Sequence, residues 1–182
     1  MKRYFNTEGT CKPNIHYMVR IDDRLDKIKR FYIDEGKYFV INRGRQYGKT
    51  TTLMMLEQYL GNDYMVVFLD FQKMSDDSFR NGSAFACSFA KYFIDAMSEK
   101  QKETVSSTVQ ELSKAAMTNK LNLESLFVYL SRICGEASQP VVLMIDEVDS
   151  ASNNQVFIEF LAMLRGYYLK REDTPTNSKP YF

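Results

Sequence analysis

The sequence predicts a three-layer α/β domain built on a mostly parallel sheet. Two observations support this prediction. An apolar run at residues 38–41 is followed by a glycine-containing loop and a helical pattern, and a second apolar run at residues 141–145 ends in acidic residues. Continuous apolar runs are typical of strands buried on both faces of a parallel sheet, whose connections run through helices. With 182 residues and 45% hydrophobic content, the chain can form one domain with a substantial core.

The loop between residue 41 and the following helix has the composition of a phosphate-binding loop. Backbone N–H groups at a helix start favour a phosphate, and a glycine such as Gly48 lets the backbone approach it closely. Lys49 would bind the outer phosphates and Thr50 would bind Mg²⁺. We therefore expect the loop to bind Mg²⁺-ATP or GTP through these residues: Gly44, Arg45, Gln46, Tyr47, Gly48, Lys49, Thr50 and Thr51.

One position departs from the general pattern G-x-x-x-x-G-K-[ST]. Arg43 stands where the pattern has its first glycine, and Gly44 comes one place later. The shift changes how the loop leaves the strand and keeps the part that holds the β-phosphate. The alternative interpretation is a Gly-Lys-Thr at an ordinary helix start. The acidic motif described next favours the phosphate loop over this alternative.

That acidic motif is Asp146-Glu147 at the end of the run 141–145, about a hundred residues after the loop. Ligands of open α/β sheets bind beyond the carboxyl ends of the strands, so Asp146 would lie beside the phosphate loop and hold the Mg²⁺ shell. Glu147 would be the general base that polarises a water for attack on the γ-phosphate. The alternative is a solvated acidic turn in which Asp149 or Ser150 caps a helix from about residue 152, and for Asp149 we prefer it.

Together these residues indicate a family. Residues 38–53 resemble the phosphate loop of the bacterial AAA-like P-loop ATPases, in which an Arg-rich loop without the first glycine is usual. Segments 5–9, 16–19, 69–72 and 145–147 also resemble that family, so the resemblance covers nearly the whole chain. It implies a P-loop ATPase with a catalytic glutamate after the Mg²⁺-binding aspartate, and ATP hydrolysis coupled to a conformational change.

The resemblance also suggests where the base would bind. In such ATPases the segment ahead of the first helix lines the adenine pocket, which makes Tyr17, Met18 and Val19 candidates for contact with the base. An N-terminal arm packed on the core is an equally weighted alternative. His16, the one histidine of the chain, we interpret as a packing or capping residue rather than a catalyst.

The remaining elements follow in order. An extended arm at residues 1–20 precedes a P-loop ATPase core at residues 21–182. The core begins with a helix that Asp22 or Asp23 would cap and Gly36 would end. A strand at residues 64–69 ends at Asp70, which we interpret as structural rather than metal-binding. Residues 82–136 carry apolar stripes at helical spacing and form a helical insertion, and the aromatic residues at these positions belong in the interior. A further helix includes residues 156–164.

Parts that the resemblance implies are not found in the sequence. They are the sensor strand, a fifth strand and a helical lid with an arginine, and residues 170–182 are loop-like. We therefore expect an amino-terminal fragment or truncated product whose sheet is incomplete on the C-terminal side. Unpaired strand edges would make the isolated chain marginally stable, with weak or absent turnover, whereas the intact form would hydrolyse ATP.

Other function classes fit less well. A small-molecule kinase would not need Glu147 beside Asp146, whereas a non-hydrolysing nucleotide switch or a decayed scaffold remains a serious alternative. A net charge of +1 gives no indication of a basic surface that would bind nucleic acid. DNA contact through a region that the sequence lacks remains an open alternative. Three widely spaced cysteines predict reduced thiols and no zinc site. No apolar run approaches the ~20 residues of a membrane span, and we expect a cytoplasmic protein.

Overall fold

The computed structural model describes residues 3–7, 9, 11–12, 14–42, 44 and 47–170. The chain divides into two compact units, Met1–Asn62 and Asp63–Phe182.

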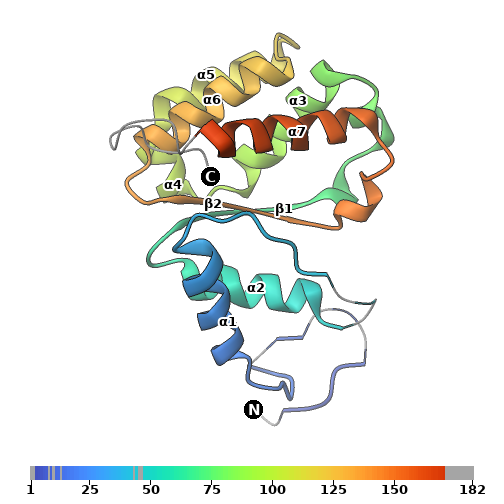
Figure 1. The fold of residues 1–182 in the computed structure, drawn as a ribbon, viewed down its shortest axis with the longest axis vertical. Helices are drawn as coiled ribbons and strands as arrows, with labels where there is room; N and C mark the ends of the chain where they lie inside the picture. Colours follow the sequence, from blue (N-terminus) through green and yellow to red (C-terminus); the bar gives the residue numbers. More distant parts are fainter. Residues whose placement is uncertain are drawn as a thin grey trace. The chain divides into compact units, whose positions relative to one another are not determined.

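The first unit contains two helices in contact with each other (Figure 1). Helix α1 (Asp22–Ile28) continues into a π-helical turn (Lys29–Ile33), and helix α2 spans Lys49–Leu60. The Tyr59 hydroxyl of α2 lies 3.5 Å from the Asp26 carboxylate of α1. The prediction of a helix after residue 21 is confirmed, and Gly36 follows it with a left-handed backbone at φ 62°.

The predicted cap of α1 is wrong. No side chain caps this helix, whose N-cap residue is Ile21. Asp22 and Asp23 instead lie in the first turn, where a negative charge interacts favourably with the helix dipole.

The strand predicted at residues 38–41 is also wrong for this structure. Residues 37–42 have no strand or helix hydrogen-bonding pattern, and Val40 is 82% exposed. A strand exists only where a neighbour pairs with its N–H and C=O groups. The two strands that the structure describes belong to the second unit and pair with each other.

The N-terminal arm is held by local contacts around His16. Tyr4 and His16 form an isolated parallel bridge, and their rings meet edge to face at 4.9 Å. The backbone N–H of Lys12 donates to Nδ1 of His16 at 2.9 Å, and His16 is 6% exposed. These contacts confirm a packing role for the histidine.

The second unit is mixed α/β with a small parallel sheet of two strands, β1 (Met65–Asp70) and β2 (Val141–Asp146). Its helices lie on one face of this sheet in Figure 1. They are α3 (Gly82–Ala96), α4 (Glu99–Thr104), α5 (Ser106–Met117), α6 (Leu123–Glu136) and α7 (Gln155–Lys170). The predicted strands at 64–69 and 141–145 and the helices at 82–136 are confirmed. Helix α7 begins later than predicted because residues Val148–Ser150 first form a 3₁₀ turn.

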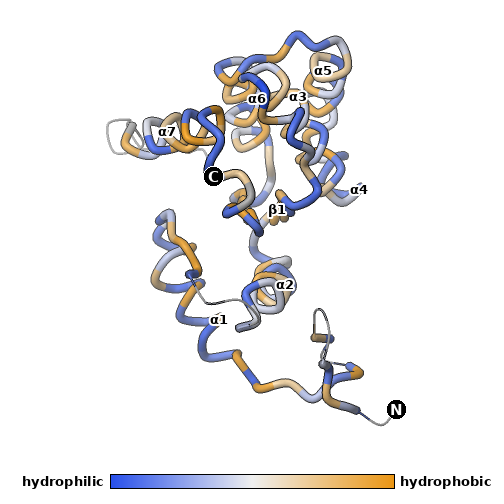
Figure 2. Tube along the Cα trace, turned by 90° about the vertical axis from the view of Figure 1, so that its right-hand side faces the viewer, coloured by the Kyte–Doolittle hydropathy of each residue, from blue (hydrophilic) through white to orange (hydrophobic). Residues whose placement is uncertain are grey.

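Side-chain caps mark where several of these helices begin. The Asn81 side chain accepts a hydrogen bond from the N–H of Ala84 at the start of α3. Helices α4 and α6 begin with capping boxes built on Ser98 and Asn122. Figure 2 shows hydrophobic and hydrophilic segments alternating along α3, α5, α6 and α7, which amphipathic helices packed on a core require.

Aromatic rings form the centre of this core. Phe160 of α7 is fully buried, and its ring centroid lies 4.9 Å from that of Phe89, 5.2 Å from Phe85 and 5.5 Å from Phe127. The ring of Phe71, directly after β1, contacts the same cluster through Phe157 at 5.5 Å. The prediction that aromatic residues of the helices lie in the interior is confirmed, and the cluster anchors the chain where β1 ends.

Candidate functional site

The predicted phosphate loop enters helix α2 through a left-handed glycine. Gly48 has φ 72° and ψ 32°, and α2 begins at the next residue, Lys49. A residue with a Cβ is strained in this region of backbone space, so the turn favours a glycine here. The Thr52 hydroxyl donates to the Gly48 carbonyl at 2.8 Å, which ties the first turn of the helix to the loop.

Gly44, the glycine that comes one place late, has a local structural reason. A Cβ on Gly44 would lie 3.2 Å from the ring of Tyr47, closer than most Cβ contacts. Tyr47 itself is 73% exposed. The glycine therefore lets the tyrosine ring lie close to the backbone of Gly44. Arg43, Arg45 and Gln46 lie outside the described residues.

Lys49, Thr50 and Thr51 occupy the first turn of α2 and are partly exposed. Backbone N–H groups of a first helical turn point outward along the helix axis, and the helix dipole makes that end attractive to anions. The ammonium of Lys49 and the hydroxyl of Thr50 thus belong to the helix end where a phosphate is expected to bind.

The segment predicted to contact the base lies in the N-terminal arm. Tyr17 is half exposed, and its ring lies 5.0 Å from that of Phe5. Met18 is partly exposed, and Val19 is 84% exposed. These residues have no regular secondary structure, and their contact with a base stays a prediction.

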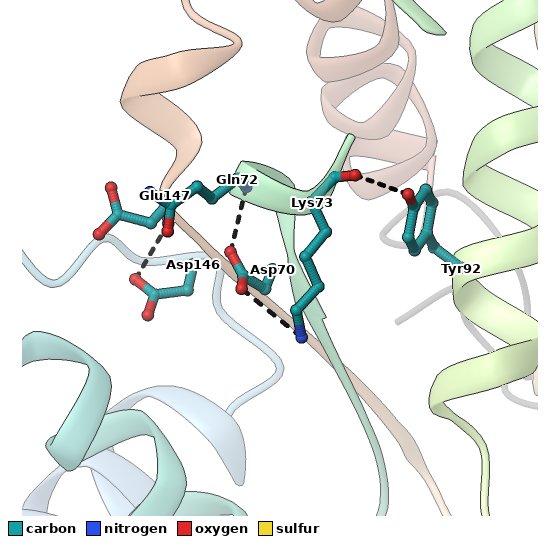
Figure 3. Close-up of polar contacts among 6 residues, drawn as sticks. All are labelled: Asp70, Gln72, Lys73, Tyr92, Asp146 and Glu147. Atoms are coloured by element: carbon teal, nitrogen blue, oxygen red, sulfur yellow. Dashed lines mark hydrogen bonds and ion pairs between the residues drawn. The ribbon is translucent and has the colours of Figure 1, made fainter. Parts of the chain in front are cut away.

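The acidic motif lies at the carboxyl end of β2. Asp146 is 6% exposed, and its Oδ1 accepts a hydrogen bond from the backbone N–H of Glu147 at 3.0 Å (Figure 3). Glu147 has φ 56° and ψ 37°, a left-handed conformation that glutamate rarely adopts. Such strain costs of order 1–3 kcal/mol and tends to occur at functional sites. The kink ends the strand after Asp146.

A second aspartate ends the neighbouring strand. Asp70 pairs in register with Asp146, so the two strand ends lie side by side. Asp70 accepts the N–H of Gln72 at 3.0 Å, and its other oxygen lies 3.6 Å from Nζ of Lys73. Asp70 therefore caps a 3₁₀ turn (Phe71–Lys73), which supports the structural interpretation over the metal-binding one.

Among the described residues, no group of three or more His, Cys, Asp or Glu side chains is arranged to hold a metal ion. Mg²⁺ bound together with a nucleotide needs fewer protein ligands, because phosphates and water complete its octahedron. A buried carboxylate and a helix-terminal hydroxyl are both oxygen donors, the type that Mg²⁺ prefers. Asp146 and Thr50 therefore fit this ion by the chemistry of their side chains.

A comparison with protein-family models finds a match to the AAA-like domain over residues 8–179. The chain belongs to the AAA-like domain family. This match spans the loop before α2 as well as the acidic end of β2, and it supports a nucleotide-binding, ATPase-like protein. The searches of curated proteins and of solved structures found no match.

None of the helices within the described part of this AAA-like chain has both the length and the apolar character of a membrane span. The predicted lysine and acid pair belong to different compact units. Their convergence on one triphosphate stays a prediction.

Two features of the site were not predicted from the sequence. The left-handed conformation of Glu147 has no signal in its residue type, since glutamate has no preference for that region. The Asp70 cap did have a signal, because an aspartate followed by a turn often accepts the N–H two residues later.

Proposed function

We propose that this AAA-like chain binds Mg²⁺-ATP and hydrolyses it to ADP and inorganic phosphate. The observation that supports this most is that one family match covers both motifs. The first has a left-handed Gly48 directly before α2, and the second has a buried Asp146 and a left-handed Glu147 at the end of a parallel strand. We infer that residues 21–182 form the ATPase core, a three-layer P-loop domain with residues 82–136 as a helical insertion, preceded by an arm at residues 1–20.

In this proposal the phosphates bind at the start of α2. The loop from Gly44 to Thr51 supplies backbone N–H groups, and Lys49 supplies a positive charge toward the outer phosphates. Tyr17, Met18 and Val19 contact the adenine. ATP is preferred over GTP on the strength of the family alone.

Asp146 and Thr50 are the residues that would hold Mg²⁺, which would neutralise charge on the phosphate oxygens. Glu147 then acts on water. Its carboxylate accepts a proton from a water whose oxygen attacks the γ-phosphorus, and the bond from that phosphorus to the β–γ bridging oxygen breaks. The left-handed backbone directs the Glu147 side chain away from the path that a continuing strand would give it. Hydrolysis, rather than binding alone, depends on this residue.

The test combines a Mg²⁺-ATP titration with a phosphate-release assay. Lys49→Ala should weaken ATP binding by about tenfold to a hundredfold, the loss of a charge-assisted hydrogen bond. Glu147→Gln should retain binding and lower turnover by about 10²–10⁴-fold. The matched controls are Lys100→Ala and Glu103→Gln, two exposed residues of α4, which should leave both quantities unchanged.

The outcomes separate the alternatives. A wild-type chain that binds ATP, but releases no more phosphate than the Glu147→Gln variant, is a nucleotide switch. A chain that does not bind ATP, with Lys49→Ala behaving like the wild type, is a scaffold, and the proposal is then wrong.

A further inference from the structure

The turn after β1 is fixed at both of its ends. At its start, Asp70 accepts the N–H of Gln72 at 3.0 Å and lies 3.6 Å from the Lys73 ammonium. At its end, the Tyr92 hydroxyl of α3 donates to the Lys73 carbonyl at 2.6 Å, as Figure 3 shows. Phe71, the first residue of the turn, is 1% exposed in the aromatic core. The turn Phe71–Lys73 is therefore held by side chains and by burial at the same time.

This turn lies against the turn that follows Glu147. The 3₁₀ turns Phe71–Lys73 and Val148–Ser150 contact each other. The second turn is closed by a hydrogen bond of 3.1 Å from the N–H of Ala151 to the carbonyl of Val148. Because β1 and β2 are in register up to Asp70 and Asp146, the two turns leave the sheet side by side.

We propose that Asp70 and Tyr92 are positioning residues for Glu147. They hold the turn Phe71–Lys73 in place, and that turn supports the turn Val148–Ser150, which keeps Glu147 in its left-handed conformation. Neither residue contacts the nucleotide in this account. The inference rests on the proposed function, because positioning Glu147 matters only if Glu147 takes part in hydrolysis. It assigns an effect on hydrolysis to Tyr92, which lies in α3 outside both sequence motifs.

The physical reason is the sensitivity of a general base to its position. A displacement of about 1 Å can cost about a hundredfold in rate, even when the mutated residue is remote from the chemistry. The phosphates are bound by the start of α2 in the proposed function, so a change in this support should alter kcat and spare the affinity for ATP.

The kinetic test uses Asp70→Ala, Asp70→Asn and Tyr92→Phe. Asp70→Ala removes the cap and should lower kcat by about tenfold to a hundredfold, with KM for ATP within about twofold of the wild type. Asp70→Asn retains an oxygen that accepts the Gln72 N–H, so it should restore most of the lost kcat. Tyr92→Phe keeps the ring and loses the hydrogen bond to Lys73, and it should lower kcat in the same direction. Tyr129→Phe in α6 is the matched control and should match the wild type.

A second measurement needs no turnover. Hydrogen exchange in the nucleotide-free chain should be faster in Asp70→Ala than in the wild type over residues 147–151, while exchange in α6 stays unchanged. Equal exchange over residues 147–151 in both proteins overturns the inference, and so does a wild-type kcat in Asp70→Ala.

The two proposals fail in different ways. If Asp70→Ala does not fold, Tyr92→Phe decides, and a wild-type kcat in that variant overturns the inference. If the wild-type chain shows no phosphate release, the proposed function fails and hydrogen exchange alone decides whether Asp70 supports the Glu147 turn.

Discussion

The left-handed backbone of Glu147 predicts which of two variants, Glu147→Gly or Glu147→Ala, is the more stable. At φ 56° and ψ 37°, a residue with a Cβ costs about 1–2 kcal/mol relative to glycine. Glycine loses about 0.5–1 kcal/mol more conformational entropy on folding than alanine. At the midpoints of these two ranges, Glu147→Gly is more stable than Glu147→Ala by about 0.75 kcal/mol. At an ordinary helix or strand position the order would be the reverse.

Urea unfolding of both variants measures this difference, provided that the dependence on urea has the same slope in each. Gly166 supplies the matched control, because it lies inside α7 and an added Cβ would meet no atom within 4 Å. Gly166→Ala should stabilise the chain by about 0.8–1 kcal/mol. If Glu147→Ala is as stable as Glu147→Gly or more stable, Glu147 does not have a left-handed backbone in solution, and our account of the site is wrong.

Three further predictions concern the core, the pH dependence and the base. Phe160→Ala should lower the free energy of unfolding by about 3–5 kcal/mol, whereas Leu161→Ala, at a residue that is 45% exposed, should change it little. A loss below about 1 kcal/mol in Phe160→Ala would contradict a core position for Phe160. Burial raises the pKa of Glu57 above 4.5, so stability falls as the pH rises from 4.5 through the raised pKa. Glu57→Gln should therefore raise the free energy of unfolding at pH 7 and should no longer do so below pH 4.5. An equal gain in stability at both pH values contradicts this prediction. Val19→Asp should weaken ATP binding by about tenfold with unfolding unchanged, whereas an unchanged affinity rules out its contact with the base.

Much of the second unit could be predicted because its elements are long and strongly patterned. The stripe through Leu126, Leu130 and Ile133 fixes α6, and all three side chains are fully buried. The apolar run that ends at Asp146 likewise fixes β2. The run at residues 38–41 is also apolar, yet it forms no strand. Residue type records only a preference for extended backbone, while a strand also needs a partner, which a local pattern does not specify.

The candidate site shows the same limit at finer scale. Gly48 was predictable, because its residue type matches the left-handed turn before α2. Glu147 adopts the same region without that match, so only the packing around it can impose the conformation. The residues that do so, in our account Asp70 and Tyr92, are distant in sequence from Glu147.

The two strand ends explain why one of two similar motifs is the better candidate for chemistry. Both strands end in an aliphatic residue followed by aspartate, Leu69-Asp70 and Ile145-Asp146. After Asp70 the chain turns inward, since Phe71 is 1% exposed, and the aspartate serves the turn as its cap. After Asp146 comes a charged residue that the core does not accept, and the backbone turns left-handed instead. In our proposal, the strand end followed by the buried Phe71 supports structure, and the strand end followed by Glu147 presents a carboxylate for reaction.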